Sequence, residues 1–425
     1  MNLEAVARAE ARLLLPTYDR KRVLFRRGQG CYLWDDRGRR YLDWLSGIGV
    51  CALGYNHPAV LAAIRKQAPR LVHISNLFYH DYQAALAERL ARISGLDRAF
   101  FCNSGSEAIE GALKLARAYA RLHNKNGSKA PWRFLAMENS FHGRTAGALA
   151  ATATKKYREP FEPLLPGVRF VKFNNAADLE KKFDGSVCAV LLEPIQGEGG
   201  INPVTPEFFS LARKLAERHG ALLIADEIQC GLGRTGEYFA FQKYGVTPDI
   251  LALAKPLASG LPLGAIVTRE HVAAAIKPGL HGTTFGGGPL ACAVAITFLD
   301  TLQRENVIAN VRRVGKYFRE KLETVKRQHP SVVEARGIGL MLALQLGVPG
   351  KDVVDACLAR GLVINCTHDT VLRFLPPFII TEKQVDEGMK LLDQALTEVE
   401  SKNGSRVPHP SPGLARVGVT TGKKR

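Results

Sequence analysis

Short apolar runs that end in one charged residue are the clearest pattern along the chain. Residues 221–225 read Ala-Leu-Leu-Ile-Ala and lead into Asp226, and residues 250–254 read Ile-Leu-Ala-Leu-Ala and lead into Lys255. Apolar runs of this length, bounded by glycine and proline, are typical of buried parallel strands. Because ligands of open α/β sheets bind at the carboxyl ends of the strands, we expect Asp226 and Lys255 to face a ligand.

The same patterning predicts strands and helices in alternation over most of the chain. Further strands are expected at 99–102, 132–137, 188–192 and from about 260, and helices at 59–68, 82–93, about 105–122 and 206–219. The start of the chain predicts a short amphipathic helix, a linker that begins at Pro16 and a hairpin over 31–43 with a polar turn. This alternation indicates an α/β fold with a large, mostly parallel sheet.

From about residue 306 the pattern changes to a long basic helix followed by short strands and helices. We interpret this region as a smaller α+β domain. The tail after residue 400 is rich in Gly, Ser, Pro and basic residues and is expected to be disordered. The predicted parts are an N-terminal segment (1–60), a large domain (61–305), a small C-terminal domain (306–400) and a basic tail (401–425).

A turn rich in small residues joins the strand at 99–102 to the helix that follows. It reads Asn-Ser-Gly-Ser-Glu-Ala over 103–108. A strand, a small-residue turn and a helix together direct backbone N–H groups and the helix N-terminus at a phosphate. Ser104 and Ser106 can equally cap the helix, with Glu107 as a favourable first-turn charge. The two interpretations are compatible, because a cap and a phosphate site use the same amides.

Further candidate chemistry lies in Ser-Phe-His-Gly-Arg over 140–144. The ring of Phe141 suits stacking on a planar ligand, and the guanidinium of Arg144 suits bidentate binding of a carboxylate. A surface salt bridge is the alternative for Arg144, and we interpret His142 as structural. An amine and a carboxylate at strand ends suit a Schiff base with an aldehyde cofactor and a protonated pyridine nitrogen, respectively.

Together these motifs resemble the class III, fold-type I, pyridoxal-phosphate-dependent aminotransferases over roughly residues 15–398. Within that family the Phe-His-Gly-Arg motif and Asn-Leu-Phe-Tyr at 76–79 favour the acetylornithine branch. The resemblance implies pyridoxal 5′-phosphate (PLP) on Lys255, with its ring nitrogen on Asp226. It implies cofactor contacts from Gly105, Ser106, Phe141, Gln229 and, across a homodimer interface, Thr284. It implies substrate contacts from Arg144, Thr283, Glu193 and Arg373.

The resemblance also implies a reaction. N-acetylornithine would donate its δ-amino group to 2-oxoglutarate, with its carboxylate on Arg144. Glu193 would pair with Arg373 and release it for the keto acid, although a purely structural ion pair remains an alternative. Other donors in the family are ornithine, succinylornithine, 4-aminobutyrate and a lysine-biosynthesis intermediate. Decarboxylation or amino-group migration on the same fold are the more distant alternatives.

Composition adds limits on other function classes. The formal net charge is +18, but residues 401–425 hold six basic residues and no acidic one, and the remaining charge forms no basic block. We therefore expect no nucleic-acid partner. The eight cysteines are scattered without a Cys-x-x-Cys pair, which favours reduced thiols over disulfides or a metal site. No signal peptide or membrane span is indicated, so a cytoplasmic location is expected.

Overall fold

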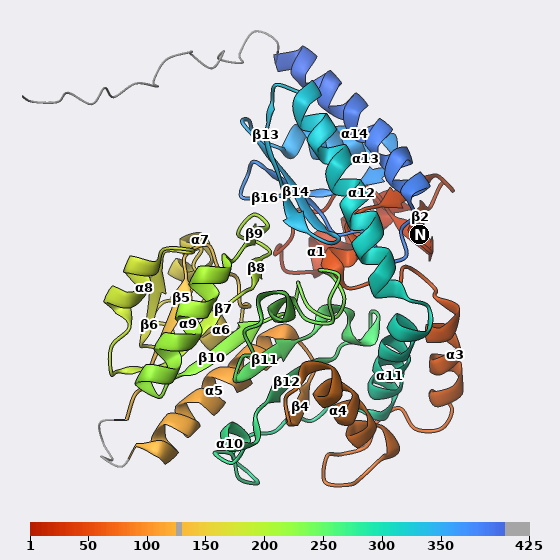
Figure 1. Ribbon diagram of the computed structural model, residues 1–425. Helices are drawn as coiled ribbons and strands as arrows, with labels where there is room; N and C mark the ends of the chain where they lie inside the picture. Colours follow the sequence, from red (N-terminus) through yellow and green to blue (C-terminus); the bar gives the residue numbers. More distant parts are fainter. Residues whose placement is uncertain (125–129, 404–425) are drawn as a thin grey trace, which may run out of the picture.

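The computed structural model describes residues 1–124 and 130–403. A seven-stranded sheet forms the centre of its larger part, in the order β4-β12-β11-β10-β7-β5-β6 (Figure 1). These strands are β4 (Arg98–Cys102), β5 (Arg133–Met137), β6 (Val168–Val171), β7 (Val187–Leu192), β10 (Leu222–Asp226), β11 (Ile250–Leu253) and β12 (Gly264–Thr268). Of the predicted tail at 401–425, residues 401–403 are not disordered but end the helix α14 (Glu382–Asn403), and residues 404–425 lie outside the described residues.

The sheet is mostly parallel, as the apolar runs predict. β10 pairs in parallel with β7 and with β11, and Asp226 lies opposite Ala252 in that register. β12 runs antiparallel to β11 and to β4, so it is the return strand expected from about residue 260. The carboxyl ends of β4, β5, β7, β10 and β11 therefore meet at one edge of the sheet.

Helices cover both faces of this sheet, which explains why its central strands are apolar without alternation. Along β10, Leu222 and Ile224 belong to the core beneath α5, whereas Leu223 and Ala225 belong to the core that includes α9. The helices of this larger part are α3 (Pro58–Gln67), α4 (Asp81–Ser94), α5 (Gly105–His123), α6 (Ala146–Ala150), α7 (Lys155–Arg158), α8 (Ala176–Lys182), α9 (Pro206–His219), α10 (Glu270–Ala273) and α11 (Pro289–Arg304).

The helix α9 shows how local sequence sets these boundaries. Thr205 caps its first turn through a hydrogen bond from Phe208 N to Thr205 Oγ1 (3.3 Å), and Pro206 occupies the first helical position. Gly220 ends the helix in the left-handed conformation (φ 64°) that glycine adopts readily. β10 begins two residues after this glycine, so the end of α9 determines where the strand that carries Asp226 starts.

The C-terminal part forms a second sheet in the order β13-β14-β17-β16. Its strands are β13 (Val332–Ile338), β14 (Met341–Leu346), β16 (Asn365–Thr367) and β17 (Val371–Phe374), and all their pairings are antiparallel. The helices α12 (Val307–Gln328), α13 (Lys351–Arg360) and α14 (Glu382–Asn403) pack with it and with one another (Figure 1). This arrangement is the α+β pattern expected after residue 306.

The N-terminal segment is joined to the C-terminal part. The predicted hairpin is present as β2 (Tyr32–Asp35) and β3 (Arg40–Asp43), and β3 continues in parallel with β15 (Leu362–Val363). Trp44 is fully buried, and its ring centroid lies 4.4 Å from that of Phe318. One prediction was wrong: the linker after Pro16 is interrupted by β1 (Phe25–Gln29), which pairs with β2.

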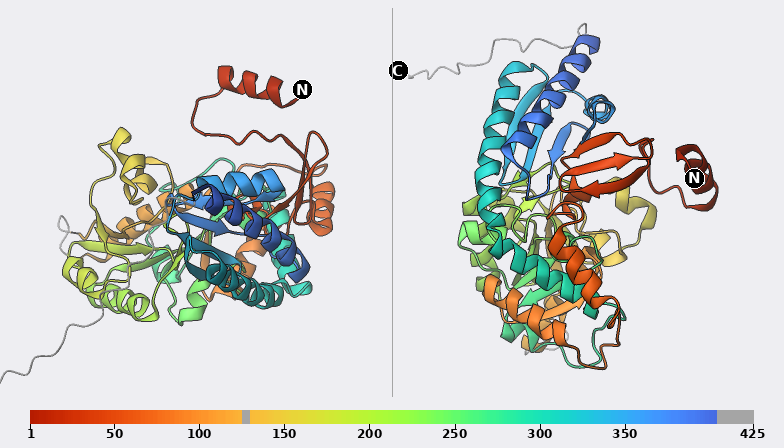
Figure 2. Two further views of the ribbon diagram at one scale, coloured as in Figure 1. Left: turned by 90° about the horizontal axis from the view of Figure 1, so that it is seen from above. Right: turned by 90° about the vertical axis from the view of Figure 1, so that its right-hand side faces the viewer.

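The first helix, α1 (Leu3–Leu13), has no buried residue and stands apart from the body of the protein in both views of Figure 2.

A short turn, α2 (Ser46–Gly49), follows β3. The remaining short elements are β8 (Ile195–Gln196), β9 (Asn202–Pro203) and the 3₁₀ turns η2 (Glu159–Phe161), η3 (Ala240–Tyr244) and η4 (Lys255–Ala258). Among the described helices, none is both long and apolar enough to cross a bilayer.

His329 binds two carboxylates near the end of α14. His329, just after α12, contacts Glu400 Oε2 through Nδ1 (2.9 Å) and Asp393 Oδ1 through Nε2 (3.0 Å). Burial opposes protonation of the ring, but hydrogen bonds and charge from Glu400 and Asp393 outweigh it, so the His329 pKa is raised above 6.5. Protonation therefore stabilises the fold fully below pH 6.5, and this contribution is lost as the pH rises through the raised pKa.

We predict that His329→Gln lowers the melting temperature at pH 6 by roughly 1–3 °C. The difference from wild type should shrink as the pH is raised to 9, because the wild-type histidine loses its proton as the pH rises through its raised pKa. Thermal melts of both proteins at the two pH values measure the effect, with the exposed His271→Gln as the matched control. A deficit that is the same at both pH values would show that His329 acts without its charge.

Candidate active site

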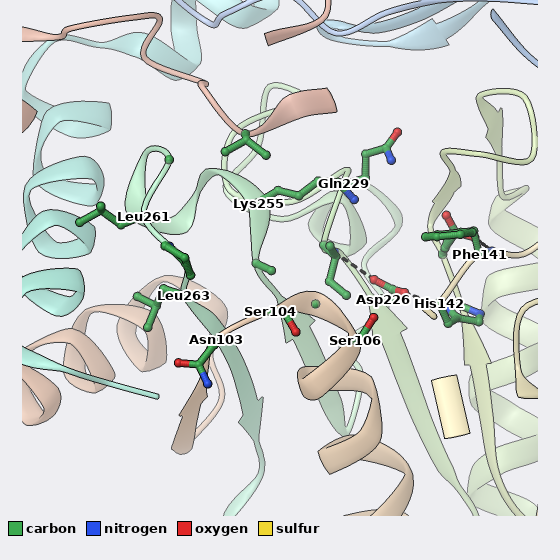
Figure 3. A pocket seen from close by; sticks show the side chains of 18 residues that line it. Asn103, Ser104, Ser106, Phe141, His142, Asp226, Gln229, Lys255, Leu261 and Leu263 are labelled. Atoms are coloured by element: carbon green, nitrogen blue, oxygen red, sulfur yellow. Dashed lines mark hydrogen bonds and ion pairs between the residues drawn. The ribbon is translucent and has the colours of Figure 1, made fainter. Parts of the chain in front are cut away.

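A pocket of about 340 Å³ lies at the edge where the carboxyl ends of the central strands meet. The segments that follow β4, β5, β7, β10 and β11 all contribute side chains to it. Figure 3 shows several of these side chains turned toward one cavity from separate elements. Of the residues predicted from sequence, the following line it: Gly105, Ser106, Phe141, Glu193, Asp226, Gln229 and Lys255.

Lys255 follows β11 and begins η4, and its side chain reaches into the pocket (Figure 3). Its backbone has a φ of 37°, a left-handed conformation that is unusual for a residue with a side chain and that often marks functional sites. Burial lowers the pKa of its amine, although the negative charges of Asp226 and Glu198 act in the opposite direction. A larger fraction of the amine is therefore neutral and nucleophilic than for an exposed lysine.

Asp226 is buried at the end of β10 and is held by two donors. His142 Nδ1 lies 2.7 Å from Asp226 Oδ2, and Ile228 N donates to Asp226 Oδ1 at 3.1 Å (Figure 3). His142 is itself fixed, because its backbone N–H donates to Thr152 Oγ1 at 2.9 Å. These contacts leave the orientation of the carboxylate little freedom. His142 thus contributes to the site by positioning Asp226.

The N-terminus of α5 closes another side of the pocket. Ser104 is the helix cap, since its Oγ accepts a hydrogen bond from Glu107 N at 3.2 Å. The backbone amides of Gly105 and Ser106 belong to the first helical turn, which has no preceding helical carbonyl to satisfy it. They therefore form an anion site directed at the pocket. Ser104 has the predicted cap role, and the phosphate contact of this turn stays a prediction.

Phe141 and Glu193 are linked through the backbone. Glu193 Oε1 accepts a hydrogen bond from Phe141 N (3.0 Å), and Oε2 accepts one from Gly197 N (2.9 Å). Burial raises the pKa of Glu193 to about 7, because desolvation and the nearby Asp226 outweigh the hydrogen bonds from the two backbone amides. Because Glu193 accepts the hydrogen bond from Phe141 N, it fixes the loop that carries the Phe141 ring.

The predicted pair between Glu193 and Arg373 was wrong. The carboxylate that pairs with Arg373 is Glu198, five residues further along, in the turn between β8 and β9. Both Glu193 oxygens are already occupied by backbone amides on the Asp226 side of the site. Arg373 is 1% exposed and also donates through Nη1 to Gln229 Oε1 (3.3 Å), which connects it to the pocket.

The charges of this pair support each other. Burial opposes ionisation of Glu198, but Arg373 and Lys255 outweigh it and lower the pKa of the carboxyl group. Thr367 Oγ1 donates to the backbone carbonyl of Glu198, so the turn is attached to β16. Glu198 is thus the ionised partner of Arg373.

The remaining predicted residues lie around the pocket. Arg144 is exposed on the loop after Phe141. Thr283 Oγ1 accepts a hydrogen bond from Asn103 Nδ2 (3.2 Å), and Asn103 lines the pocket. Thr284 is exposed and does not line the pocket of its own chain.

Several pocket residues were not identified from the sequence. Their apolar or amide side chains carry no distinctive chemistry that a sequence pattern could reveal. These residues are Val50, Asn103, Ile228, Leu261 and Leu263.

Comparison with known proteins identifies the family. The family model described as aminotransferase class-III matches residues 16–396. The chain is a class III aminotransferase. It is 46% identical over 391 residues to an acetylornithine aminotransferase from Caldanaerobacter subterraneus subsp. tengcongensis, a match that covers 92% of this chain and 98% of the relative.

Solved structures share the fold. The ornithine aminotransferase from Toxoplasma gondii superposes with a TM-score of 0.90 at 34% identity, covering 95% of this chain and 96% of the other. An amine transaminase from an uncultivated Pseudomonas species, solved in a PLP-bound form, gives 0.86 at 29% identity, covering 91% and 98%. Class III aminotransferases depend on PLP, and this chain is a PLP-dependent enzyme.

The pocket residues fit this cofactor. Four groups line one cavity: an amine with a lowered pKa, a buried carboxylate fixed by His142, an aromatic ring and an open helix N-terminus. These groups match an aldehyde, a pyridine nitrogen, a planar ring and a phosphate, respectively. The set would hold PLP through Lys255, Asp226, Phe141, Gly105 and Ser106.

Proposed function

We propose that this class III aminotransferase transfers the δ-amino group of N-acetylornithine to 2-oxoglutarate. The proposal is carried by the similarity to an acetylornithine aminotransferase over nearly the full length of both chains. The site supports this proposal because it has two arginines in different states. Arg144 is exposed, and Arg373 is already paired with the carboxylate of Glu198. A donor with one carboxylate requires one of them, and a keto acid with two carboxylates can use both.

The described residues account for the chemical roles that the reaction needs. PLP, when bound, supplies an electron sink for the electron pair left on the donor carbon. Lys255 Nζ carries the proton to and from that carbon, and its lowered pKa keeps a neutral amine available. Asp226 would hold a proton on the ring nitrogen of bound PLP, and His142 fixes the orientation of its carboxylate. Glu198 stays paired with Arg373 while the donor is bound. A carboxylate of the keto acid then takes the place of Glu198 on Arg373.

Donor identity is tested by the first half-reaction, without keto acid. PLP-loaded enzyme would be mixed separately with N-acetylornithine, ornithine and 4-aminobutyrate while the visible absorbance band of the cofactor is followed. We expect the fastest loss of the band, at the lowest concentration, with N-acetylornithine. Faster reaction with ornithine or 4-aminobutyrate would contradict the proposed donor and leave the aminotransferase chemistry in place.

We predict that Arg144→Ala raises KM for carboxylate-bearing donors by about 10- to 100-fold with a smaller loss of kcat. The reason is that the guanidinium binds a group remote from the reacting carbon. Steady-state kinetics with N-acetylornithine and with a monoamine that lacks a carboxylate measure the effect, and Arg98→Ala is the matched control because Arg98 is paired with Glu270. An equal change with both donors would contradict the role of Arg144.

We further propose that the active unit is a homodimer in which Thr284 contacts the cofactor phosphate of the other subunit. Large apolar side chains are exposed beside the loop that carries Thr284, notably Leu77 (86%), Tyr79 (103%) and Phe285 (67%). The loop that carries Leu77 and Tyr79 is attached to the loop that carries Thr284, because Asn76 Nδ2 donates a hydrogen bond to Thr283 O (3.1 Å). A patch of this kind is typical of a subunit interface. Light scattering should give twice the chain mass, and a monomer with full activity would contradict the proposal.

A further inference from the structure

Arg144 is exposed, and none of the ion pairs found between described residues includes it. Its backbone N–H donates to Ser106 Oγ (3.2 Å), so the start of the residue is fixed beside the helix N-terminus. Its charged end has no carboxylate partner among the described residues, but an aromatic group lies against it.

That group is the ring of Tyr157 on α7. The Arg144 Cζ atom lies 3.5 Å from the Tyr157 ring centroid and 5.5 Å from that of Phe141. The two rings stand edge to face, with centroids 6.3 Å apart and planes at 87°. A guanidinium stacked on an aromatic face keeps its in-plane N–H groups free for a carboxylate.

The segment that leads to Tyr157 is attached to the loop that carries Phe141. Ala153 N donates to Ser140 O (3.0 Å), and Ser140 Oγ donates to Ala151 O (2.9 Å). Tyr157 N donates to Thr154 O (3.0 Å) and closes the first turn of α7. The rings of Phe141 and Tyr157 thus belong to one connected unit, and Arg144 lies against both.

We propose that Tyr157 is a positioning residue for the donor's carboxylate. Its ring holds the Arg144 guanidinium in the orientation that binds the carboxylate, so less side-chain freedom is lost when the donor arrives. Tyr157 does not line the pocket that contains Lys255, so its removal should affect donor binding more than turnover. This inference rests on the role proposed above for Arg144.

The test compares Tyr157→Phe, which keeps the ring, with Tyr157→Leu, which removes it, in the PLP-loaded enzyme. For whichever carboxylate-bearing donor the wild type uses best, Tyr157→Leu should raise KM about three- to tenfold, with kcat changed by less than about twofold. Tyr157→Phe should behave as wild type. A monoamine without a carboxylate should give the same KM with all three proteins. In an Arg144→Ala background, Tyr157→Leu should add no further change.

The outcomes separate this inference from the proposed function. If Arg144→Ala leaves KM unchanged, both the arginine's role and that of Tyr157 are overturned, whatever the donor is. If Arg144→Ala raises KM and Tyr157→Leu does not, or if Tyr157→Phe is as impaired as Tyr157→Leu, only the role of Tyr157 is overturned. Melting temperature and cofactor absorbance are recorded for each variant. Tyr157→Met serves as a second ring-free variant, and failure of both to bind PLP would show a purely structural role and overturn the proposal.

Discussion

Lys255→Ala is expected to lower turnover by about 10⁴-fold or more, because it removes both the nucleophilic amine and the proton carrier. The buried position of Lys255 at the end of β11 and its lowered pKa give this side chain both roles. The variant should also lose the visible absorbance band of the wild-type enzyme while its melting temperature stays close to that of the wild type. Single-turnover kinetics with a saturating donor measure the loss.

Lys351→Ala is the matched control for this experiment, since Lys351 is exposed at the start of α13, far along the chain from the pocket. It should retain the band and full turnover. A small primary amine added to Lys255→Ala should restore part of the rate by supplying the missing proton carrier. Turnover by Lys255→Ala within about tenfold of wild type would contradict its assigned role.

Asp226→Asn is expected to lower turnover by about 10²- to 10⁴-fold with less effect on PLP binding. The amide retains the size of the side chain but cannot hold a positive charge on the ring nitrogen, so the cofactor becomes a weaker electron sink. His142 would also lose its charged partner at 2.7 Å. The measurement is kcat for the overall reaction, together with the position of the cofactor absorbance band.

Glu227→Gln offers a close control for that substitution. Glu227 is the next residue, equally buried, and its carboxyl group faces Ala240 N (2.6 Å) and Phe241 N (2.7 Å) and not the pocket. Burial raises its pKa to about 8, so the neutral glutamine resembles the group already present at neutral pH. Similar losses in Glu227→Gln and Asp226→Asn would contradict a specific role for Asp226.

The central strands and their functional ends could be predicted from the sequence because the physical signals there are local. The runs that precede Asp226 and Lys255 are apolar on both faces, which indicates buried parallel strands, and strand ends are where α/β ligands bind. The small residues before α5 likewise indicated an anion site. The adjacency of β10 and β11 then brings the carboxylate and the amine to one pocket.

The features that escaped prediction depend on contacts distant in the sequence. In Glu-Pro-Ile-Gln-Gly-Glu over 193–198, either glutamate could face Arg373, and only the hairpin of β8 and β9 decides between them. The strand β1 reads Phe-Arg-Arg-Gly-Gln, which lacks apolar alternation, and it forms because β2 is adjacent. The pairing of β3 with β15 joins residues some 320 positions apart, which no local pattern encodes.

The stacking of Arg144 on Tyr157 is a further example. The arginine was identified from its motif, but the ring that holds it lies 13 positions further on, in a four-residue helix. A tyrosine on a short helix has no sequence feature that distinguishes it from a packing residue. Its relevance comes from the geometry of two loops that hydrogen bonds hold together.

The most direct test of the central claim is to locate the lysine that carries the cofactor. PLP-loaded enzyme would be reduced with borohydride, which makes the link between lysine and cofactor permanent, then digested and mapped by mass spectrometry. We expect the modification on the peptide that contains Lys255 and on no other lysine, and its prior removal by excess donor. A modification on a different lysine, or none despite bound PLP, would contradict the placement of the active site at the carboxyl end of β11.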